Sequence, residues 1–184
     1  MKNFALLTTL ALCGCAAPPP TTIPTHAPAA QLVPASRIEI DDFAVGKQVK
    51  DSDAVYFTGW FPIADRLVQP AFHEAIAAKL KGGLKASGSG EVVQLAILDA
   101  GLSMDMKASD SIAFVGLATV FRERPYQCNL VVNIKTSRGS ARQVFEHTQV
   151  ANRAFGDLED KPAFVGKCQD ALVQKVADFL AKTV

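Results

Sequence analysis

The chain has 184 residues, a length typical of a single domain, and its 49% apolar and 20% charged content is that of a globular protein. Nineteen Lys and Arg residues balance eighteen Asp and Glu residues, and without residues 1–14, which contain only Lys2, the balance is eighteen of each. This neutrality argues against nucleic-acid binding, which needs clustered cations. The lack of an 18-residue apolar run beyond the N-terminus excludes a polytopic membrane protein.

Residues 1–14 have the features of a secretory signal peptide. Lys2 is positively charged, and the apolar stretch 4–12 is too short to span a bilayer. It ends in Leu12-Cys13-Gly14-Cys15, which resembles the bacterial lipobox, where a Leu and two small residues precede the lipidated Cys. The resemblance implies a bacterial lipoprotein with a diacylglycerol on the sulfur of Cys15 and, after cleavage, a palmitate-type acyl chain on its amine. Two or more acyl chains hold a protein stably on a membrane.

Two alanines follow the cysteine, at Ala16 and Ala17. An Asp there would favour retention in the inner membrane, so the resemblance implies the periplasmic face of the outer membrane. The alternative is ordinary signal-peptide cleavage after an Ala near residue 17, which would leave no lipid.

Residues 15–36 are predicted to form a lipidated, solvated tether. Six of the ten prolines lie between Pro18 and Pro34, and no Asp, Glu, Lys or Arg occurs within this region. Such sequence buries little surface and favours polyproline II. At about 3.1 Å per residue it would reach about 65 Å. The predicted organisation is a signal peptide at 1–14, the tether at 15–36 and a single α+β periplasmic domain at 37–184.

The first half of the domain is predicted to contain one strand and one helix. Alternation of polar and apolar residues predicts a strand at 37–41, and residues 46–62 are irregular. Apolar residues at every fourth position, ending at Leu84, predict a helix over 69–85 with Pro70 in its first turn.

The second half is predicted to contain three strands and a closing helix. A strand at 92–98 leads into a bulge at 99–101, and residues 126–155 form a long antiparallel hairpin. The last helix begins near Asp160, a good N-cap, with Pro162 in its first turn.

The resulting β-α-β-β-β-α order predicts an α+β fold. The sheet is antiparallel or mixed, has four to five strands and is covered on one face by both helices. Behind a lipobox and a Pro-rich segment, this order resembles the small periplasmic lipoproteins of the lipopolysaccharide-assembly and ABC-transporter-auxiliary type. The resemblance covers most of residues 37–184 and is one of pattern, because the lipobox is the only motif that can be quoted for it.

Cys128 and Cys168 remain after removal of Cys13 and lipidation of Cys15. A pair of cysteines in a periplasmic domain predicts a disulfide. Cys128 lies in the apolar set of its strand and Cys168 in the apolar stripe of the last helix, so both sulfurs point to the same interface. Two unpaired buried thiols, or a reactive redox or nucleophilic thiol, are the alternatives.

No catalytic, cofactor or metal-binding constellation is recognised. His73 and His147 lack the spacing of a metal or catalytic pair and are interpreted as solvated. Asp157, Glu159 and Asp160 would suit a hard cation, but they match no EF-hand spacing and already complement a helix N-terminus. The sequence therefore predicts a protein that is not an enzyme and binds neither metal nor cofactor.

Two apolar stretches are not obviously needed by the predicted fold. Tyr56, Phe57, Trp60 and Phe61 fall in an irregular segment, and residues 111–121 are almost unbroken apolar sequence. They are either buried in the core or, for the aromatic group, exposed as a partner-binding patch.

The leading interpretation is a lipid-anchored, non-enzymatic module that binds or scaffolds an envelope protein. The contact would use the aromatic segment or an exposed sheet edge, with strand addition as one mode. An alternative is a lipid or small-molecule binding accessory subunit of an envelope transport system, with a groove between helices and sheet. A hydrolase or redox enzyme is a third hypothesis.

Overall fold

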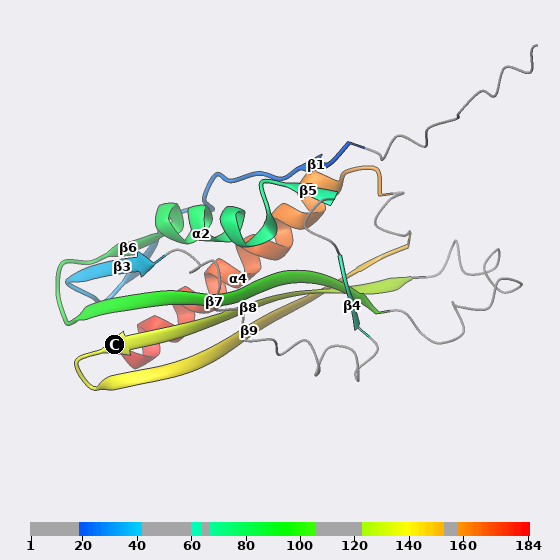
Figure 1. The fold of residues 1–184 in the computed structure, drawn as a ribbon. Helices are drawn as coiled ribbons and strands as arrows, with labels where there is room; N and C mark the ends of the chain where they lie inside the picture. Colours follow the sequence, from blue (N-terminus) through cyan, green and yellow to red (C-terminus); the bar gives the residue numbers. More distant parts are fainter. Residues whose placement is uncertain (1–18, 42–59, 64–66, 106–122, 153–157) are drawn as a thin grey trace, which may run out of the picture.

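The computed structural model describes residues 19–41, 60–63, 67–105, 123–152 and 158–184. A five-stranded mixed sheet lies at its centre, in the order β3-β7-β8-β9, with β4 pairing the second half of β7 (Figure 1). These strands are β3 (Arg37–Asp41), β4 (Trp60–Pro62), β7 (Val92–Asp105), β8 (Arg124–Thr136) and β9 (Gly139–Ala151). β3 runs parallel to β7, and the other pairings are antiparallel.

Two helices, α2 (Phe72–Gly83) and α4 (Lys161–Thr183), pack on one face of this sheet (Figure 1). Their apolar stripes and the inward residues of the strands form one continuous core. The α+β class with two helices on one face is therefore confirmed. Neither helix combines the length and the apolar character needed to cross a bilayer.

The first helix is shorter than predicted. Its N-cap is Ala71, after a cis Gln69–Pro70 peptide bond, and it ends at Gly83. Leu84 adopts extended backbone angles and begins β6 (Leu84–Ala86), yet it is only 4% exposed. The helix predicted from the apolar periodicity was too long, because Leu84 is buried in the same core but belongs to a strand.

The elements after the first helix lie close to their predicted positions. Strand β7 is continuous, and its register shifts between Ile97 and Asp99, slightly before the predicted bulge. β8 and β9 form the predicted hairpin around a two-residue turn at 137–138. Asp160 caps α4 by accepting a hydrogen bond from the Ala163 amide at 3.0 Å.

The tip of the β8–β9 hairpin makes hydrogen bonds to Glu91 and to the C-terminal residues. Glu91 accepts hydrogen bonds from the amide and hydroxyl of Ser137, and the hydroxyl contact is the main reason that the pKa of Glu91 lies below its ordinary value. The Arg138 guanidinium donates to the carbonyls of Thr183 and Val184. The tip therefore lies at the C-terminal end of α4.

Residues 19–36, predicted to be a solvated tether, pack on the domain as an N-terminal arm. In this arm β1 (Thr21–Thr22) pairs with β5 (Val68–Gln69), and β2 (Gln31–Val33) pairs with β6. Ile23, Val33 and Ala35 are each at most 2% exposed. The prediction that these residues form a tether and that the domain begins at residue 37 is wrong, because their main chain adds strands and their few apolar side chains enter the core.

Glycines let the arm approach the helices closely. A Cβ on Gly82 would lie 2.7 Å from the Cβ of Ala27, and one on Gly166 would lie 3.0 Å from the Cγ of Pro24. Gly90, in a positive-φ conformation, passes the Pro34 carbonyl so closely that a Cβ would be 2.6 Å from its oxygen. The arm is thus fitted to both helices and to the turn before β7.

We expect Gly82→Ala to destabilise the domain by about 1 kcal/mol, although alanine favours helix by about as much. The added Cβ overlaps that of Ala27, and overpacking costs about 1–3 kcal/mol. Urea denaturation measures the loss, and limited proteolysis within the arm should accelerate.

The matched control is Gly82→Ala combined with Ala27→Gly, which moves the same methyl group across the contact. It should restore slow proteolysis and most of the stability. If Gly82→Ala were as stable as the parent, with an equally protected arm, this close packing would be disproved.

Candidate functional site

The outer edge of β9 is a long strand edge that lacks a partner strand among the described residues. β9 has 13 residues, all paired with β8 on one side, and within the described ranges no strand pairs with its other side. A strand edge presents a row of main-chain donors and acceptors to any extended segment that approaches it. β9 is therefore the candidate interaction site.

The orientation of the edge groups follows from one hydrogen bond. In an antiparallel pair, alternate residues direct their amide and carbonyl to the partner strand, and the residues between them direct theirs outward. The Glu146 carbonyl accepts from Nζ of Lys175 on α4 at 2.5 Å, which places Glu146 in the outward set. The outward set is then Ser140, Arg142, Val144, Glu146, Thr148 and Val150.

Apolar side chains accompany this edge. Val144 and Val150 are 54% and 56% exposed, and both belong to the sheet face opposite the helices. The inward residues alternate with them, and Phe145 among these is 9% exposed. An extended partner strand would therefore meet main-chain groups and two exposed valines.

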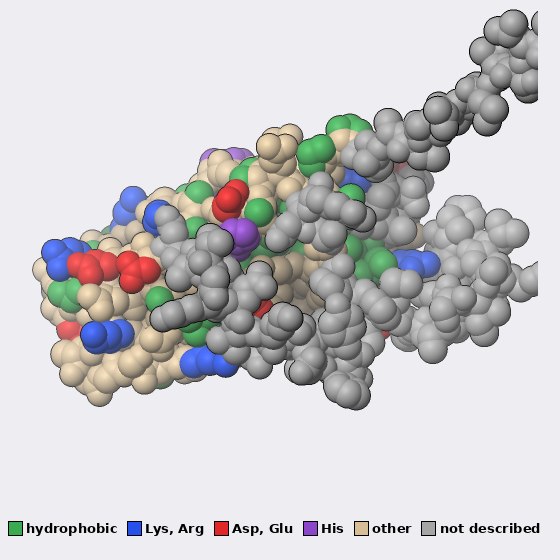
Figure 2. Space-filling model, viewed as in Figure 1, with side chains coloured by type: hydrophobic (Ala, Val, Ile, Leu, Met, Phe, Trp, Pro, Cys, Tyr) green, Lys and Arg blue, Asp and Glu red, His purple; other side chains and the backbone are tan. Residues whose placement is uncertain are grey.

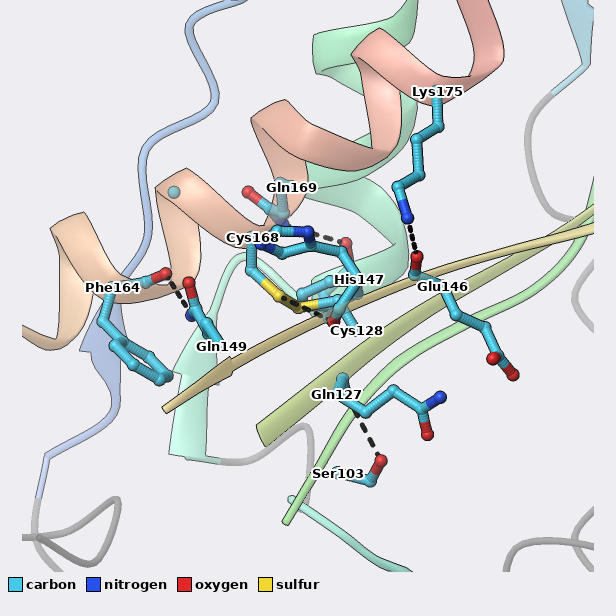
Figure 3. The surroundings of a disulfide bond; sticks show 12 residues. Ser103, Gln127, Cys128, Glu146, His147, Gln149, Phe164, Cys168, Gln169 and Lys175 are labelled. Carbon is cyan, nitrogen blue, oxygen red and sulfur yellow. Dashed lines mark hydrogen bonds between the residues drawn. A yellow bond between two sulfur atoms is a disulfide. The ribbon is translucent and has the colours of Figure 1, made fainter. Parts of the chain in front are cut away.

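Helix α4 holds β9 in place from the covered face (Figure 3). The predicted disulfide is present and joins Cys128 of β8 to Cys168 of α4, with their Cα atoms 6.1 Å apart. Nearby, Nε2 of Gln149 donates to the Phe164 carbonyl at 2.8 Å. These contacts attach α4 to both β8 and β9 on the covered face of the sheet.

His147 lies beside the disulfide and is half-buried, which differs from the solvated position expected for it (Figure 3). Burial lowers its pKa below the ordinary value of 6.5, and the positive charge of Lys175 lowers it further. The predicted solvation failed because His147 points toward α4, whose position the sequence pattern does not give.

The pKa of His147 predicts acid sensitivity. Since the folded pKa is below the unfolded one, the unfolded chain binds the proton first. The contribution of neutral His147 to the free energy of unfolding is complete above pH 6.5. It is lost as the pH falls from 6.5 through the lower pKa of the folded state. Urea midpoints measured between pH 7.5 and 5 should therefore fall less in His147→Asn than in the parent. Equal slopes would contradict the prediction.

The predicted aromatic patch is only partly within the described residues. Tyr56 and Phe57 lie outside them, as does the apolar stretch 111–121. Trp60 and Phe61 form part of β4 and pair with Asp105 and Met104 of β7, so this part of the segment is a strand rather than irregular. Whether these aromatic side chains contact a partner stays a prediction.

The acidic and histidine residues considered as metal ligands do not come together in the described part of the structure. Among the described residues there is no group of three His, Cys, Asp or Glu side chains arranged to hold a metal ion. Glu159 and Asp160 are exposed, and Asp160 serves as the α4 cap, while Asp157 lies outside the described part. His73, on α2, is half-buried.

The charged side chains on the face shown in Figure 2 are interspersed, with cationic and anionic groups side by side. This agrees with the balanced composition of the whole chain. Recognition at the β9 edge would consequently depend on main-chain and apolar contacts more than on a strong electrostatic field.

No family model and no curated protein sequence matches the chain. Similar solved structures include rare lipoprotein B from Shewanella oneidensis, with a TM-score of 0.43 and 9% identity over 80% of this chain and 95% of that one. A minor lipoprotein from Acinetobacter baumannii has a TM-score of 0.41 and 9% identity over 80% and 93%. An uncharacterized protein has a TM-score of 0.36 and 9% identity over 90% and 99%. At these TM-scores the resemblance assigns neither a family nor a function to the chain.

Proposed function

We propose that the protein is a lipid-anchored, non-enzymatic lipoprotein of the outer membrane that binds an envelope protein by strand addition to β9. The 13-residue outer edge of β9, with which no other described strand pairs, carries the proposal. The Leu12–Cys15 motif, which resembles a lipobox, supports lipidation at Cys15 and a periplasmic location.

Long strand edges promote aggregation, and proteins usually protect them with charges, prolines, bulges or covering segments. The outward set of β9 has charged side chains at Arg142 and Glu146, and Lys175 donates a hydrogen bond to the Glu146 carbonyl. The stretch 147–151 has no charged Asp, Glu, Lys or Arg side chain and includes the exposed Val150. An extended partner strand that buries this stretch would supply the missing protection.

Site-specific photo-crosslinking of the full-length protein in cells tests strand addition. A benzophenone amino acid at Val150 should crosslink to one envelope protein, whereas the same probe at Gln174, exposed on α4, should not. In the Val150 probe strain, Thr148→Pro should abolish the adduct because it removes an outward amide without breaking a bond to β8. Thr148→Ala keeps the amide and should retain the adduct. Equal adducts at both probe positions, or an adduct unaffected by Thr148→Pro, would overturn strand addition.

The anchor is tested separately. Radiolabelled palmitate should enter the mature chain, and Cys15→Ser should abolish labelling and move the protein from the membrane to the soluble fraction. Retention of Cys15→Ser in the outer membrane with unchanged labelling would disprove lipidation at this residue.

A further inference from the structure

The docked N-terminal arm fixes where the lipid anchor leaves the domain. Ile23 is 2% exposed and donates its amide to the Gln69 carbonyl at 2.9 Å, directly after the β1–β5 pairing. The arm is therefore secured from Thr21 onward.

The arm runs in the same direction as α4. Pro24 lies against Gly166 near the start of the helix. Pro28 lies beside Gly83, which also contacts Val173, about two turns further along α4. The segment before Thr21 consequently leaves at the N-terminal end of α4, where β1 and β5 also lie (Figure 1).

The opposite end of the domain carries the hairpin tip, because Arg138 contacts the carbonyls of Thr183 and Val184. From Gly166 to Thr183 the helix rises about 26 Å at 1.5 Å per residue. The two ends of the domain are thus well separated along α4.

The remaining chain between anchor and domain is short. Five residues lie between Cys15 and Thr21, and even fully extended the six Cα–Cα steps span at most about 21 Å. The solvated tether predicted from composition would have reached about three times as far.

We propose that the end of the domain formed by β1, β5 and the first turn of α4 rests against the bilayer that holds Cys15, with the hairpin tip directed away from it. This rests on the lipidation in the proposed function. Among the described residues at this end, the exposed ones include Thr22, Gln69 and Asp160, which carry no positive charge. The acyl chains and the short connection, rather than attraction to anionic lipids, impose this orientation.

The orientation is testable with the full-length lipidated protein in phosphatidylcholine vesicles that carry a short-range quencher on the lipid headgroup. Thr25→Cys and Ser140→Cys, both at exposed positions, receive the same fluorescent label. We expect several-fold stronger quenching at position 25, unchanged by high salt. A flexible Gly-Ser insert of 20 residues between Ala17 and Pro18 should reduce it to the level at position 140.

The outcomes separate this inference from the proposed anchor. Palmitate incorporation with equal quenching at positions 25 and 140, or quenching at position 25 that the insert leaves unchanged, overturns the orientation but leaves lipidation standing. Absence of palmitate overturns both. Gly82→Ala, which displaces the arm without altering Cys15, is a second variant and should likewise weaken quenching at position 25.

Discussion

Reduction of the Cys128–Cys168 disulfide is expected to lower the free energy of unfolding by about 4 kcal/mol. The bond spans 40 positions of sequence, and in the chain-entropy model a closed loop of this size restricts the unfolded chain by about that amount. It also connects α4 to the central strand β8 inside the core, where both cysteines are fully buried. Losing it removes a large fraction of the stability of an ordinary domain.

Urea denaturation with and without dithiothreitol measures this effect. Reduced parent protein isolates the loss of the bond, since no side-chain volume is removed. The Cys128→Ala/Cys168→Ala variant should be weakened at least as much and should no longer respond to dithiothreitol. Two titratable thiols in the native, oxidised protein, or an unchanged midpoint after reduction, would contradict the prediction.

Asp170→Ala is expected to cost about 3 kcal/mol, because it leaves a buried cation without its counterion. The Lys79 side chain is 1% exposed, and its ammonium lies 2.5 Å from a carboxylate oxygen of Asp170. The ammonium of Lys79 also donates a hydrogen bond to the Gly166 carbonyl, at 3.3 Å. Asp170 itself is 42% exposed, so water solvates the carboxylate but barely reaches the ammonium.

The control uses the difference in exposure between the buried Lys79 and the partly exposed Asp170. Lys79→Met keeps most of the volume and removes the charge, and the freed Asp170 can be hydrated, so we expect a change within about 1 kcal/mol. In the Lys79→Met background, Asp170→Ala should be nearly neutral. Chemical denaturation of the four proteins gives the coupling energy directly. An equal loss from both single substitutions would show that burial of the ammonium is not the dominant cost.

The elements that were predicted correctly depend on local patterns. Alternation in 126–134 and the stripe of the last helix placed Cys128 and Cys168 on facing surfaces, and Asp160 with Pro162 marked the start of α4. Each is determined by neighbours within a few residues. For the same reason the fold class and its covered sheet face could be predicted from the sequence.

The features that were missed depend on contacts between distant residues. Composition made the arm resemble a tether, since nothing near Ala27 indicates that Gly82 leaves space for it. Nothing near Lys79 in the sequence indicates that it is buried and paired, because Asp170, which balances its charge, lies 91 positions away. The unpaired edge of β9 is a property of the assembled sheet. The lipid-carrier and enzyme hypotheses stay predictions without a described feature that favours either.

The contact of Pro24 with Gly166 joins segments about 140 residues apart. Contacts of such long sequence separation form late and slow the folding of a chain. The pairings of the arm with β5 and β6 need only the first 90 residues, but Pro24 can reach its position against Gly166 only after α4 has been synthesised and has docked on the sheet. Complete docking of the arm, and with it the fixed exit point of the proposed lipid anchor, would therefore come at the end of folding.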